Sequence, residues 1–287
     1  MYYSQGIAVV TIPAVALVTG GGSGIGLMAS LALAVNGAKV YIVGRTSEKL
    51  ERVKDLYSQN ITGQIIPITA DMTSKESIHK LVKEIESREK ALHILINNAG
   101  ISSAKVNTDA EDPKELQQEL FESEESNFEE WEQVFRTNVC QPFFATTAFL
   151  PLLQKGTDLD HGWSSAVISI TSISGVLKTS QHHFAYNSSK AAAIHLSKML
   201  AHEVTSSGLK IRVNNIAPGV FPSQMTASGE GDKKTGVPKN KYEHIPAGRP
   251  GKDEDMASTV LFTVANQYLN GQTIVVDGGY VLDIGSI

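Results

Sequence analysis

The sequence predicts a single α/β domain in which a doubly wound parallel sheet carries helices on both faces. Short apolar segments alternate with segments whose apolar residues recur at helical spacing, which is typical of βαβ units. Right-handed crossovers then distribute the helices over the two faces of the sheet. No change of composition marks a domain boundary, so we expect one domain over 13–287 after a short N-terminal extension over 1–12.

The first elements carry the clearest signals. Residues 15–19 are short, continuous and apolar and end at glycines, which predicts a buried strand. Residues 24–36 repeat apolar residues at helical spacing, and Gly37 follows as a typical helix stop. A second apolar strand is expected over 39–43, and a charged amphipathic helix over 47–57.

The same alternation continues toward the C-terminal end. The remaining strands are expected at 64–69, 93–97, 166–171, 210–215 and 272–276, and the remaining helices at 74–89, 183–206 and 253–265.

Three segments interrupt this alternation. Ile101–Trp131 is rich in Asp and Glu, and we interpret it as an acidic insertion that forms a solvated loop and helix. Lys155–Ser165 is polar and is expected to be a surface loop. Ser223–Tyr242 follows the carboxyl end of a strand, where open α/β sheets bind ligands, so it is a candidate substrate lid.

The composition excludes several classes of protein. With 25 Lys+Arg against 30 Asp+Glu, the formal net charge of −5 argues against a nucleic-acid-binding surface. No apolar run reaches the roughly 18 residues that suggest a membrane span, and the first residues lack the positive charge of a signal peptide. The single Cys140 permits no intrachain disulfide and is expected in the core. We therefore expect a cytoplasmic protein without nucleic-acid or membrane partners.

A glycine-rich turn, Thr19–Gly26, lies between the first strand and the first helix. Small residues let the backbone approach a pyrophosphate, and the helix N-terminus offers free N–H groups to it. The spacing is G-x-x-x-G-x-G rather than the commoner G-x-G-x-x-G. Tight packing at a strand–helix corner is the alternative explanation, but the flanking βαβ pattern favours a dinucleotide site.

Tyr186 and Lys190 are four residues apart, which places them one turn apart on one helix face. A tyrosine hydroxyl has an ordinary pKa near 10, too high for acid–base work at neutral pH. A nearby ammonium favours the phenolate and lowers that pKa. The pair alone is weak evidence, because Y-x-x-x-K occurs by chance in many helices. Its position is more informative, since it begins a helix soon after the end of the buried strand at 166–171.

Together these motifs resemble the short-chain dehydrogenase/reductase family, over nearly the whole chain from about Ala14 to Gly279. The resemblance is closest to the 3-oxoacyl-carrier-protein reductase and carbonyl reductase branch. The matching positions are Thr19-Gly20-x-x-x-Gly24-x-Gly26, Asp71, Asn97-Asn-Ala-Gly100, Asn138, Ser172, Tyr186-x-x-x-Lys190, Pro218-Gly219 and Asp277-Gly-Gly279. The chain departs from the family pattern in its longer acidic insertion after Gly100, in the fourteen residues from Ser172 to Tyr186, and in a shorter link over Ala265–Gly271. These departures bear on the substrate rather than on the chemistry.

The resemblance implies a Rossmann-type fold and four catalytic residues. Tyr186 would act as the general acid, and Lys190 would lower its pKa and bind the nicotinamide ribose. Ser172 would hydrogen-bond the substrate oxygen. Asn138 would kink its helix and support a water chain to Lys190, although a plain polar helix residue is the alternative.

The same resemblance implies an NADPH/NADP⁺ site. Its expected cofactor-binding residues are Gly20, Gly22, Ser23, Gly24, Ile25, Gly26, Arg45, Thr46, Asp71, Met72, Asn98, Ala99, Gly100, Tyr186, Lys190, Pro218, Gly219, Val220 and Ser223. For the Asn97–Asn98 pair, a strand-end turn is an alternative that is compatible with cofactor binding.

The end of the second strand predicts a preference for NADPH over NADH. An NAD-specific site places an acidic residue there to bind the 2′-hydroxyl. Here Gly44 leaves room for a 2′-phosphate, and Arg45 offers it a planar set of donors. Ser23 weakens the argument, because many NADP-binding relatives carry a basic residue at that position.

The expected activity is the reversible, NADPH-dependent reduction of a ketone or other carbonyl substrate to a secondary alcohol. Two alternatives remain open: the same fold recruited for isomerisation or cyclisation, and a non-catalytic nucleotide-binding scaffold. The expected partners are a small carbonyl or alcohol substrate and further copies of the chain, in a tetramer or a dimer. That last expectation rests on the resemblance and on the apolar face of Ala191–Leu200.

The histidines and the C-terminal motif are less informative. His182 and His183 adjoin the predicted catalytic helix and either line the substrate cleft or belong to an ordinary polar loop. His195 and His202 share a helix face but lack an H-E-x-x-H or cysteine pattern, so no metal site is predicted. Asp277–Gly279 is interpreted as a structural turn near a subunit interface.

Overall fold

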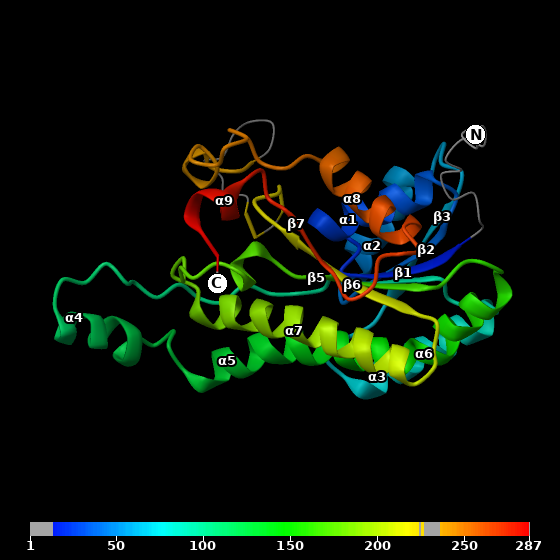
Figure 1. The fold of residues 1–287 in the computed structure, drawn as a ribbon, viewed down its shortest axis with the longest axis horizontal. Helices are drawn as coiled ribbons and strands as arrows, with labels where there is room; N and C mark the ends of the chain where they lie inside the picture. Colours follow the sequence, from blue (N-terminus) through cyan, green and yellow to red (C-terminus); the bar gives the residue numbers. More distant parts are fainter. Residues whose placement is uncertain (1–13, 224, 227–235, 287) are drawn as a thin grey trace.

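The computed structural model describes residues 14–223, 225–226 and 236–286, and Figure 1 shows their fold. It contains a seven-stranded parallel sheet in the order β3-β2-β1-β4-β5-β6-β7, with helices on both faces. The predicted fold class is confirmed. The predicted extension over 1–12 and much of the candidate lid, residues 224 and 227–235, lie outside the described residues.

Most elements lie where the sequence predicts them. The strands are β1 (Val15–Thr19), β2 (Lys39–Gly44), β3 (Gln64–Thr69), β4 (Ile94–Asn97), β5 (Ala166–Ile170), β6 (Arg212–Pro218) and β7 (Thr273–Val276). The α-helices are α1 (Gly24–Val35), α2 (Ser47–Tyr57), α3 (Lys75–Arg88), α4 (Pro113–Gln117), α5 (Phe128–Phe135), α6 (Gln141–Leu159), α7 (Phe184–Ser206), α8 (Asp253–Ala265) and α9 (Tyr280–Ile284). Two π-helical turns, η1 (Gln118–Glu122) and η2 (Arg136–Cys140), and two 3₁₀ turns, η3 (Ile173–Gly175) and η4 (Lys239–Lys241), complete the described chain.

The core forms two layers, one on each face of the sheet. Alternate strand residues point to opposite faces, so Val18 of β1 joins α1, α2 and α8 while its neighbour Leu17 joins α3, α6 and α7. Both strand faces are buried, which explains why the strands are continuously apolar rather than alternating. No helix in the described part of the chain is long and apolar enough to cross a membrane.

The strand order determines where a ligand binds. β1 pairs with β2 on one side and with β4 on the other. Successive strands are therefore added to one side of β1 up to β3 and to its other side from β4 onward. In open α/β sheets a crevice forms at this reversal, beyond the carboxyl ends of the strands. The loops after β1, β4, β5 and β6 all leave the sheet at this edge.

Two predictions about the middle of the chain are wrong. Lys155–Ser165 is not a surface loop throughout, because α6 continues to Leu159. Gly156 and Thr157 are buried there, and Thr157 donates a hydrogen bond to the carbonyl oxygen of Lys210. Small and polar groups make this contact, so no apolar residue marks the buried side. Cys140 is exposed rather than in the core, because the turn η2 places its side chain outward.

The acidic segment after β4 projects from the rest of the molecule. An irregular stretch leads to α4 and η1, which lie at the far end of the molecule in Figure 1, and α5 returns the chain to the sheet. Asp112 caps α4 by accepting hydrogen bonds from two backbone N–H groups. Phe121 and Phe128 are largely exposed, at 74% and 85%, so this segment buries little apolar surface of its own.

Candidate active site

A cleft opens at the carboxyl edge of the sheet and consists of two adjoining cavities. One, of about 360 Å³, lies against the β1–α1 turn, and we call it the glycine-turn cavity. The other, of about 390 Å³, is lined by His182, His183 and His244, and we call it the histidine cavity. The residues that line both cavities are Ile25, Thr171, Tyr186, Ser223 and Met225.

The β1–α1 turn requires glycine for backbone reasons. Gly20 and Gly24 have φ angles of +65° and +51°, in the left-handed region that favours glycine. A Cβ atom on Gly26 would collide with the carbonyl oxygen of Gly20 and the side-chain amide of Asn98. Ser23 precedes α1 and makes no side-chain capping bond. The first N–H groups of α1 are therefore available to an anion.

Asn98 and Thr19 connect this turn to the end of β4. The side-chain amide of Asn98 donates to the carbonyl oxygens of Thr19 at 3.0 Å and Gly20 at 3.1 Å. The Thr19 hydroxyl accepts hydrogen bonds from the backbone N–H groups of Asn98 and Ala99, both at 3.0 Å. Asn98 thus has the strand-end role that the sequence left open, and it also lines the glycine-turn cavity. Thr19 is a positioning residue that the sequence reasoning did not single out.

The opposite end of the glycine-turn cavity is lined by Gly44, Arg45 and Asp71. Arg45 is exposed. A carboxylate oxygen of Asp71 accepts hydrogen bonds from the backbone N–H of Thr73 at 2.9 Å and from its hydroxyl at 2.8 Å. These bonds hold the pKa of Asp71 below its ordinary value, and Arg45 adds to the effect. Asp71 is therefore a fixed, ionised acceptor at this end.

Most of the predicted cofactor residues face the cleft. Those that line the glycine-turn cavity are Gly20, Ser23, Gly24, Ile25, Arg45, Asp71, Met72, Asn98, Ala99, Gly100, Tyr186, Lys190 and Ser223. Those that line the histidine cavity are Ile25, Tyr186, Pro218, Gly219, Val220 and Ser223. Gly22, Gly26 and Thr46 line neither cavity, because Gly26 packs behind Gly20 and Thr46 precedes α2.

Tyr186 and Lys190 lie in the first two turns of α7, and Ser172 follows the end of β5. The ammonium of Lys190 lies 5.6 Å from the Tyr186 ring centroid and donates to the carbonyl oxygen of Ile170 at 3.0 Å. Ser172 and Tyr186 both line the histidine cavity. The neighbouring Thr171 hydroxyl instead donates to Asn215 in β6, at 3.0 Å. The structure therefore brings Ser172, Tyr186 and Lys190 to one place.

Burial is the largest cause of the pKa shifts of Tyr186 and Lys190. It raises the pKa of Tyr186, while the hydrogen bond with Ser172 opposes the rise. It lowers the pKa of Lys190 to about 8. The expected lowering of the Tyr186 pKa by Lys190 is not seen, because burial destabilises the phenolate and the hydrogen bond with Ser172 offsets only part of the rise. Tyr186 is accordingly a protonated hydrogen-bond donor at neutral pH.

Asn138 lies in the π-helical turn η2, between α5 and α6, and is buried. Its side-chain oxygen accepts from the backbone N–H of Ile101, and its amide donates to the Ile101 carbonyl oxygen, both at 2.9 Å. The amide also donates to the hydroxyl of Ser189 at 3.0 Å, and Ser189 donates to the carbonyl oxygen of Tyr186 at 2.7 Å. Asn138 therefore positions the β4 loop against α7. Ser189, directly before Lys190, is a further member that the sequence reasoning missed.

The segment after β6 closes the cleft over the β1–α1 turn. A Cβ atom on Gly24 would lie 3.0 Å from the Cβ of Ser223, so Ser223 lies directly over the turn. A Cβ atom on Gly219 would lie 2.7 Å from the Cα of Asp277. The Asp277 carboxylate accepts hydrogen bonds from the backbone N–H groups of Gly279 and Val281. Asp277–Gly279 is thus a structural turn that supports the cleft from behind.

His182 and His183 both lie in the turn before α7 and line the histidine cavity. The Nδ1 atom of His183 lies 3.0 Å from the Ser103 carbonyl oxygen, and that of His182 lies 3.2 Å from the Thr108 hydroxyl. Both rings are therefore held against the segment that follows β4. Within the described ranges no group of three or more His, Cys, Asp or Glu side chains is placed to hold a metal ion.

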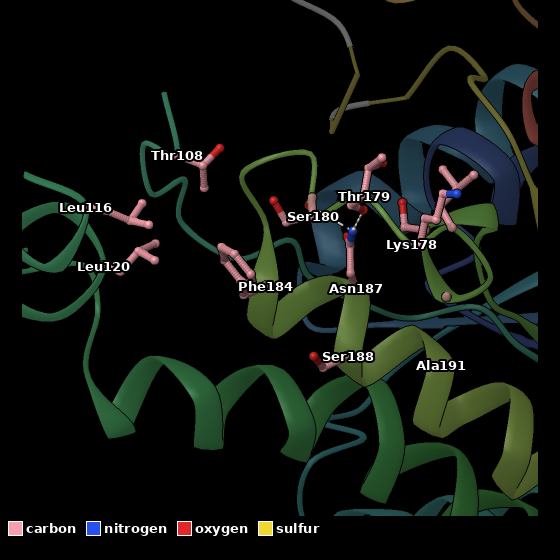
Figure 2. A pocket seen from close by; sticks show the side chains of 13 residues that line it. Thr108, Leu116, Leu120, Lys178, Thr179, Ser180, Phe184, Asn187, Ser188 and Ala191 are labelled. Atoms are coloured by element: carbon pink, nitrogen blue, oxygen red, sulfur yellow. Dashed lines mark hydrogen bonds between the residues drawn. The ribbon is translucent and has the colours of Figure 1, made fainter. Parts of the chain in front are cut away.

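A separate hollow of about 510 Å³ lies between the acidic segment and the first turns of α7, and Figure 2 shows it. Leu116, Leu120 and Phe184 point toward it from the two sides. Asn187 borders both this hollow and the histidine cavity. Its amide donates to the carbonyl oxygens of Thr179 and Ser180, at 3.0 and 2.8 Å. Tyr186 and Lys190 do not line this hollow, which is therefore distinct from the candidate active site.

Comparisons with known proteins find similar sequences and structures. Short-chain dehydrogenase/reductase PhomF of Diaporthe leptostromiformis is 38% identical over 272 residues, which cover 92% of this chain and 90% of that protein. The rhamnolipids biosynthesis 3-oxoacyl-[acyl-carrier-protein] reductase of Pseudomonas aeruginosa is 34% identical over 270 residues, with 93% and 96% covered. Among solved structures, the Pseudomonas aeruginosa RhlG/NADP active-site complex superposes with a TM-score of 0.79 at 31% identity and covers 96% of this chain and 99% of that chain.

A second solved structure, the NADPH-dependent 3-quinuclidinone reductase from Rhodotorula rubra, has a TM-score of 0.76 at 26% identity, with 96% of this chain and 94% of that chain covered. The family model for short chain dehydrogenases matches residues 14–234. With this match and these relatives, the chain belongs to the short-chain dehydrogenase/reductase family of oxidoreductases.

Proposed function

We propose that this protein reduces a ketone to a secondary alcohol with NADPH, in a reversible reaction. The observation that carries the proposal is the convergence of Ser172, Tyr186 and Lys190 on a cleft that continues into the glycine-turn cavity. A hydride donor and a proton donor are the two requirements of carbonyl reduction, and the two cavities provide one place for each.

The glycine-turn cavity fits NADPH. Gly20, Gly24 and Gly26 allow close backbone approach to a pyrophosphate, and the free N-terminus of α1 faces the same cavity. Gly44 and Arg45 suit a 2′-phosphate better than a 2′-hydroxyl. When bound, NADPH supplies the hydride that the carbonyl carbon takes up. The similarity to a solved NADP complex and to an NADPH-dependent reductase supports this choice of cofactor.

The polar side chains of the cleft then supply the proton and stabilise the reacting oxygen. Tyr186 donates its hydroxyl proton to the carbonyl oxygen as the carbon is reduced, and its raised pKa keeps that proton in place until then. The Ser172 hydroxyl donates a hydrogen bond to the same oxygen and stabilises its developing charge. Lys190, with a pKa of about 8, is suited to return a proton toward Tyr186. Asn138 and Ser189 act as positioning residues behind this set.

The proposal is tested by incubating the full-length protein with NADPH and a panel of ketones and acyl thioesters, and by following both NADPH absorbance and the alcohol product. Stoichiometric loss of NADPH with formation of a secondary alcohol is the expected result. Product formation without net NADPH consumption would instead indicate isomerisation or cyclisation on the same fold.

The protein is also proposed to form a homo-oligomer. Phe143 of α6 and Met199 of α7 are exposed on the layer that covers one face of the sheet, and Phe262 of α8 is exposed on the layer that covers the other face. Two separate apolar faces on opposite layers suit an assembly with two kinds of interface, such as a tetramer.

A further inference from the structure

The histidine cavity has the opposite charge balance to the protein as a whole. The chain carries more acidic than basic residues, yet no Asp or Glu of the described chain lines this cavity. Its ionisable lining consists of Lys105, Lys241, the tyrosines Tyr186 and Tyr280, and three histidines. A cleft lined by one sign of charge concentrates ligands of the other sign.

Lys105 and Lys241 come from segments far apart in the sequence. Lys105 belongs to the irregular stretch after β4, and Lys241 ends η4. Within the described residues neither lysine forms an ion pair. Burial lowers the pKa of Lys241, and repulsion from Lys105 lowers it further. Two like charges held together without a counter-ion destabilise the site, and a bound anion would offset that cost.

The N-terminal end of α7 adds positive potential on the same side of the cavity. His183 precedes the 23-residue helix α7, whose first turn contains no acidic residue, so the positive end of the helix dipole is not neutralised by the helix itself. Lys105 and Lys241 both lower the pKa of His183, although burial is the larger cause. The lysines are thus close enough to this helix end to act on the same ligand.

The reacting groups lie in the same cavity. Ser172 and Tyr186 line it together with apolar side chains such as Ile173 and Phe221. Its volume of about 390 Å³ is within the range of small-molecule sites. A substrate whose carbonyl oxygen meets Ser172 and Tyr186 therefore extends within one cavity toward the lysines.

We propose that the substrate is a small oxo acid, whose carboxylate is bound by Lys105 and Lys241 while its ketone is held at Ser172 and Tyr186. This inference rests on the proposed ketone reduction and specifies the substrate class for it. The reduction converts the ketone to a secondary alcohol and leaves the carboxylate unchanged, with the hydride supplied by NADPH and the proton by Tyr186.

The test compares oxo acids with their methyl esters, using 4-oxopentanoate, 5-oxohexanoate and 6-oxoheptanoate so that one length fits the cavity. For at least one length, kcat/KM with NADPH should be about ten-fold or more higher for the acid than for its ester. Lys105→Gln and Lys241→Gln should each lower kcat/KM for that acid roughly ten- to a hundred-fold and change the ester less than about two-fold. Lys83→Gln on α3 is the matched control, because it removes the same charge from an exposed position outside the cleft.

Ionic strength gives an independent readout. The advantage of the acid over the ester should shrink as NaCl rises to about 0.5 M, since salt screens exposed charges. Equal kcat/KM for acid and ester in the wild type at every length, or an equal loss for both in the lysine variants, would overturn the inference and leave ketone reduction intact.

Failure of the proposed function would look different. If the wild type reduced neither acids nor esters, the proposed reduction would be contradicted, and binding of the same oxo acids to NADP⁺-loaded protein, measured by calorimetry, would decide the anion site alone. The site is supported if the double variant Lys105→Gln with Lys241→Gln binds the oxo acid at least ten-fold more weakly than the wild type. Lys83→Gln should bind it as the wild type does. Absence of binding would overturn it.

Discussion

The side-chain amide of Asn138 donates a hydrogen bond to the hydroxyl of Ser189 at 3.0 Å, across two segments separated by 51 residues. Ser189 in turn bonds the carbonyl oxygen of Tyr186 and directly precedes Lys190. The π-helical turn η2 displaces Asn138 from the regular helical path and directs it at Ile101 and α7. A turn of helix with irregular hydrogen bonding thus connects the β4 loop to the helix that carries the proposed acid.

Asn138→Ala is expected to lower both stability and activity. It leaves the backbone N–H and carbonyl of Ile101 without their partner, which costs about 1–3 kcal/mol for each buried group left unsatisfied. The melting temperature should fall by roughly 2–4 °C for each kcal/mol, and kcat should fall more than KM rises. Ser189→Ala is the matched comparison, because it removes only the outer end of this connection. A variant Asn138→Ala with wild-type stability would contradict the structural role.

Cofactor preference should depend on Gly44 and Arg45. A Cβ atom on Gly44 would meet only Leu50, at an ordinary distance of 3.5 Å, so Gly44→Asp is sterically acceptable and places a carboxylate beside the adenine ribose site. It should shift the NADPH/NADH ratio of kcat/KM roughly ten- to a hundred-fold toward NADH, and Arg45→Ala should reduce it by a similar factor. Arg52→Ala, an exposed charge on α2 outside the cavity, should leave the ratio unchanged. A wild type that prefers NADH would refute the assignment.

The buried charge of Lys190 should make stability depend on pH. Burial lowers its pKa from 10.5 to about 8 in the folded protein. Below a pH of about 8 Lys190 is charged in both the folded and the unfolded state, and the folded state bears the full free-energy cost of burying that charge. Above a pH of 10.5 Lys190 is neutral in both states, and this cost disappears. The free energy of unfolding of the wild type should therefore rise relative to Lys190→Met, by about 3 kcal/mol across this window.

Because other titrating groups cancel in that difference, urea unfolding of both proteins at neutral pH and at the upper end of the window measures it. A difference that is independent of pH would show that Lys190 is not charged and buried in the way the structure indicates.

The two exposed apolar faces predict how the assembly dissociates. Phe143→Arg should disrupt contacts made through α6 and α7, and Phe262→Arg those made through α8. Each single variant should give a smaller assembly than the wild type by light scattering, and the double variant should give a monomer. A wild type that is a stable monomer at micromolar concentration would contradict the proposal.

The sequence was sufficient for the sheet and for most of its helices. β1, β3, α2 and α8 have the predicted bounds, because continuous apolar strands and 3.6-residue periodicity leave few alternatives. The helix α6 shows why the prediction ended there. Its last turns pack through Gly156 and Thr157 against Leu92, Ser165 and Lys210, and a buried face made of small and polar groups has no apolar period to detect.

The residues of the candidate site likewise divide into those that the sequence indicated and those that only the fold brings together. Helical spacing indicated Tyr186 and Lys190 near the start of a predicted helix, and the family resemblance indicated Ser172 at the end of a predicted strand. Lys105 and Lys241 were not indicated, since one lies in an insertion and the other in a polar loop, and only the fold brings them into one cavity. The raised pKa of Tyr186 also depends on burial, which the local sequence does not specify.

The most direct test of the central claim is the steady-state rate of NADPH-dependent ketone reduction by Tyr186→Phe. Phe keeps the ring in its place and removes only the proton donor, so the rate should fall about a hundred- to ten-thousand-fold, while melting temperature and NADPH affinity stay at wild-type values. Tyr268→Phe, at a fully exposed position, is the matched control and should retain full activity. A Tyr186→Phe variant that reduces a good substrate at nearly the wild-type rate would contradict the assignment of Tyr186 as the acid.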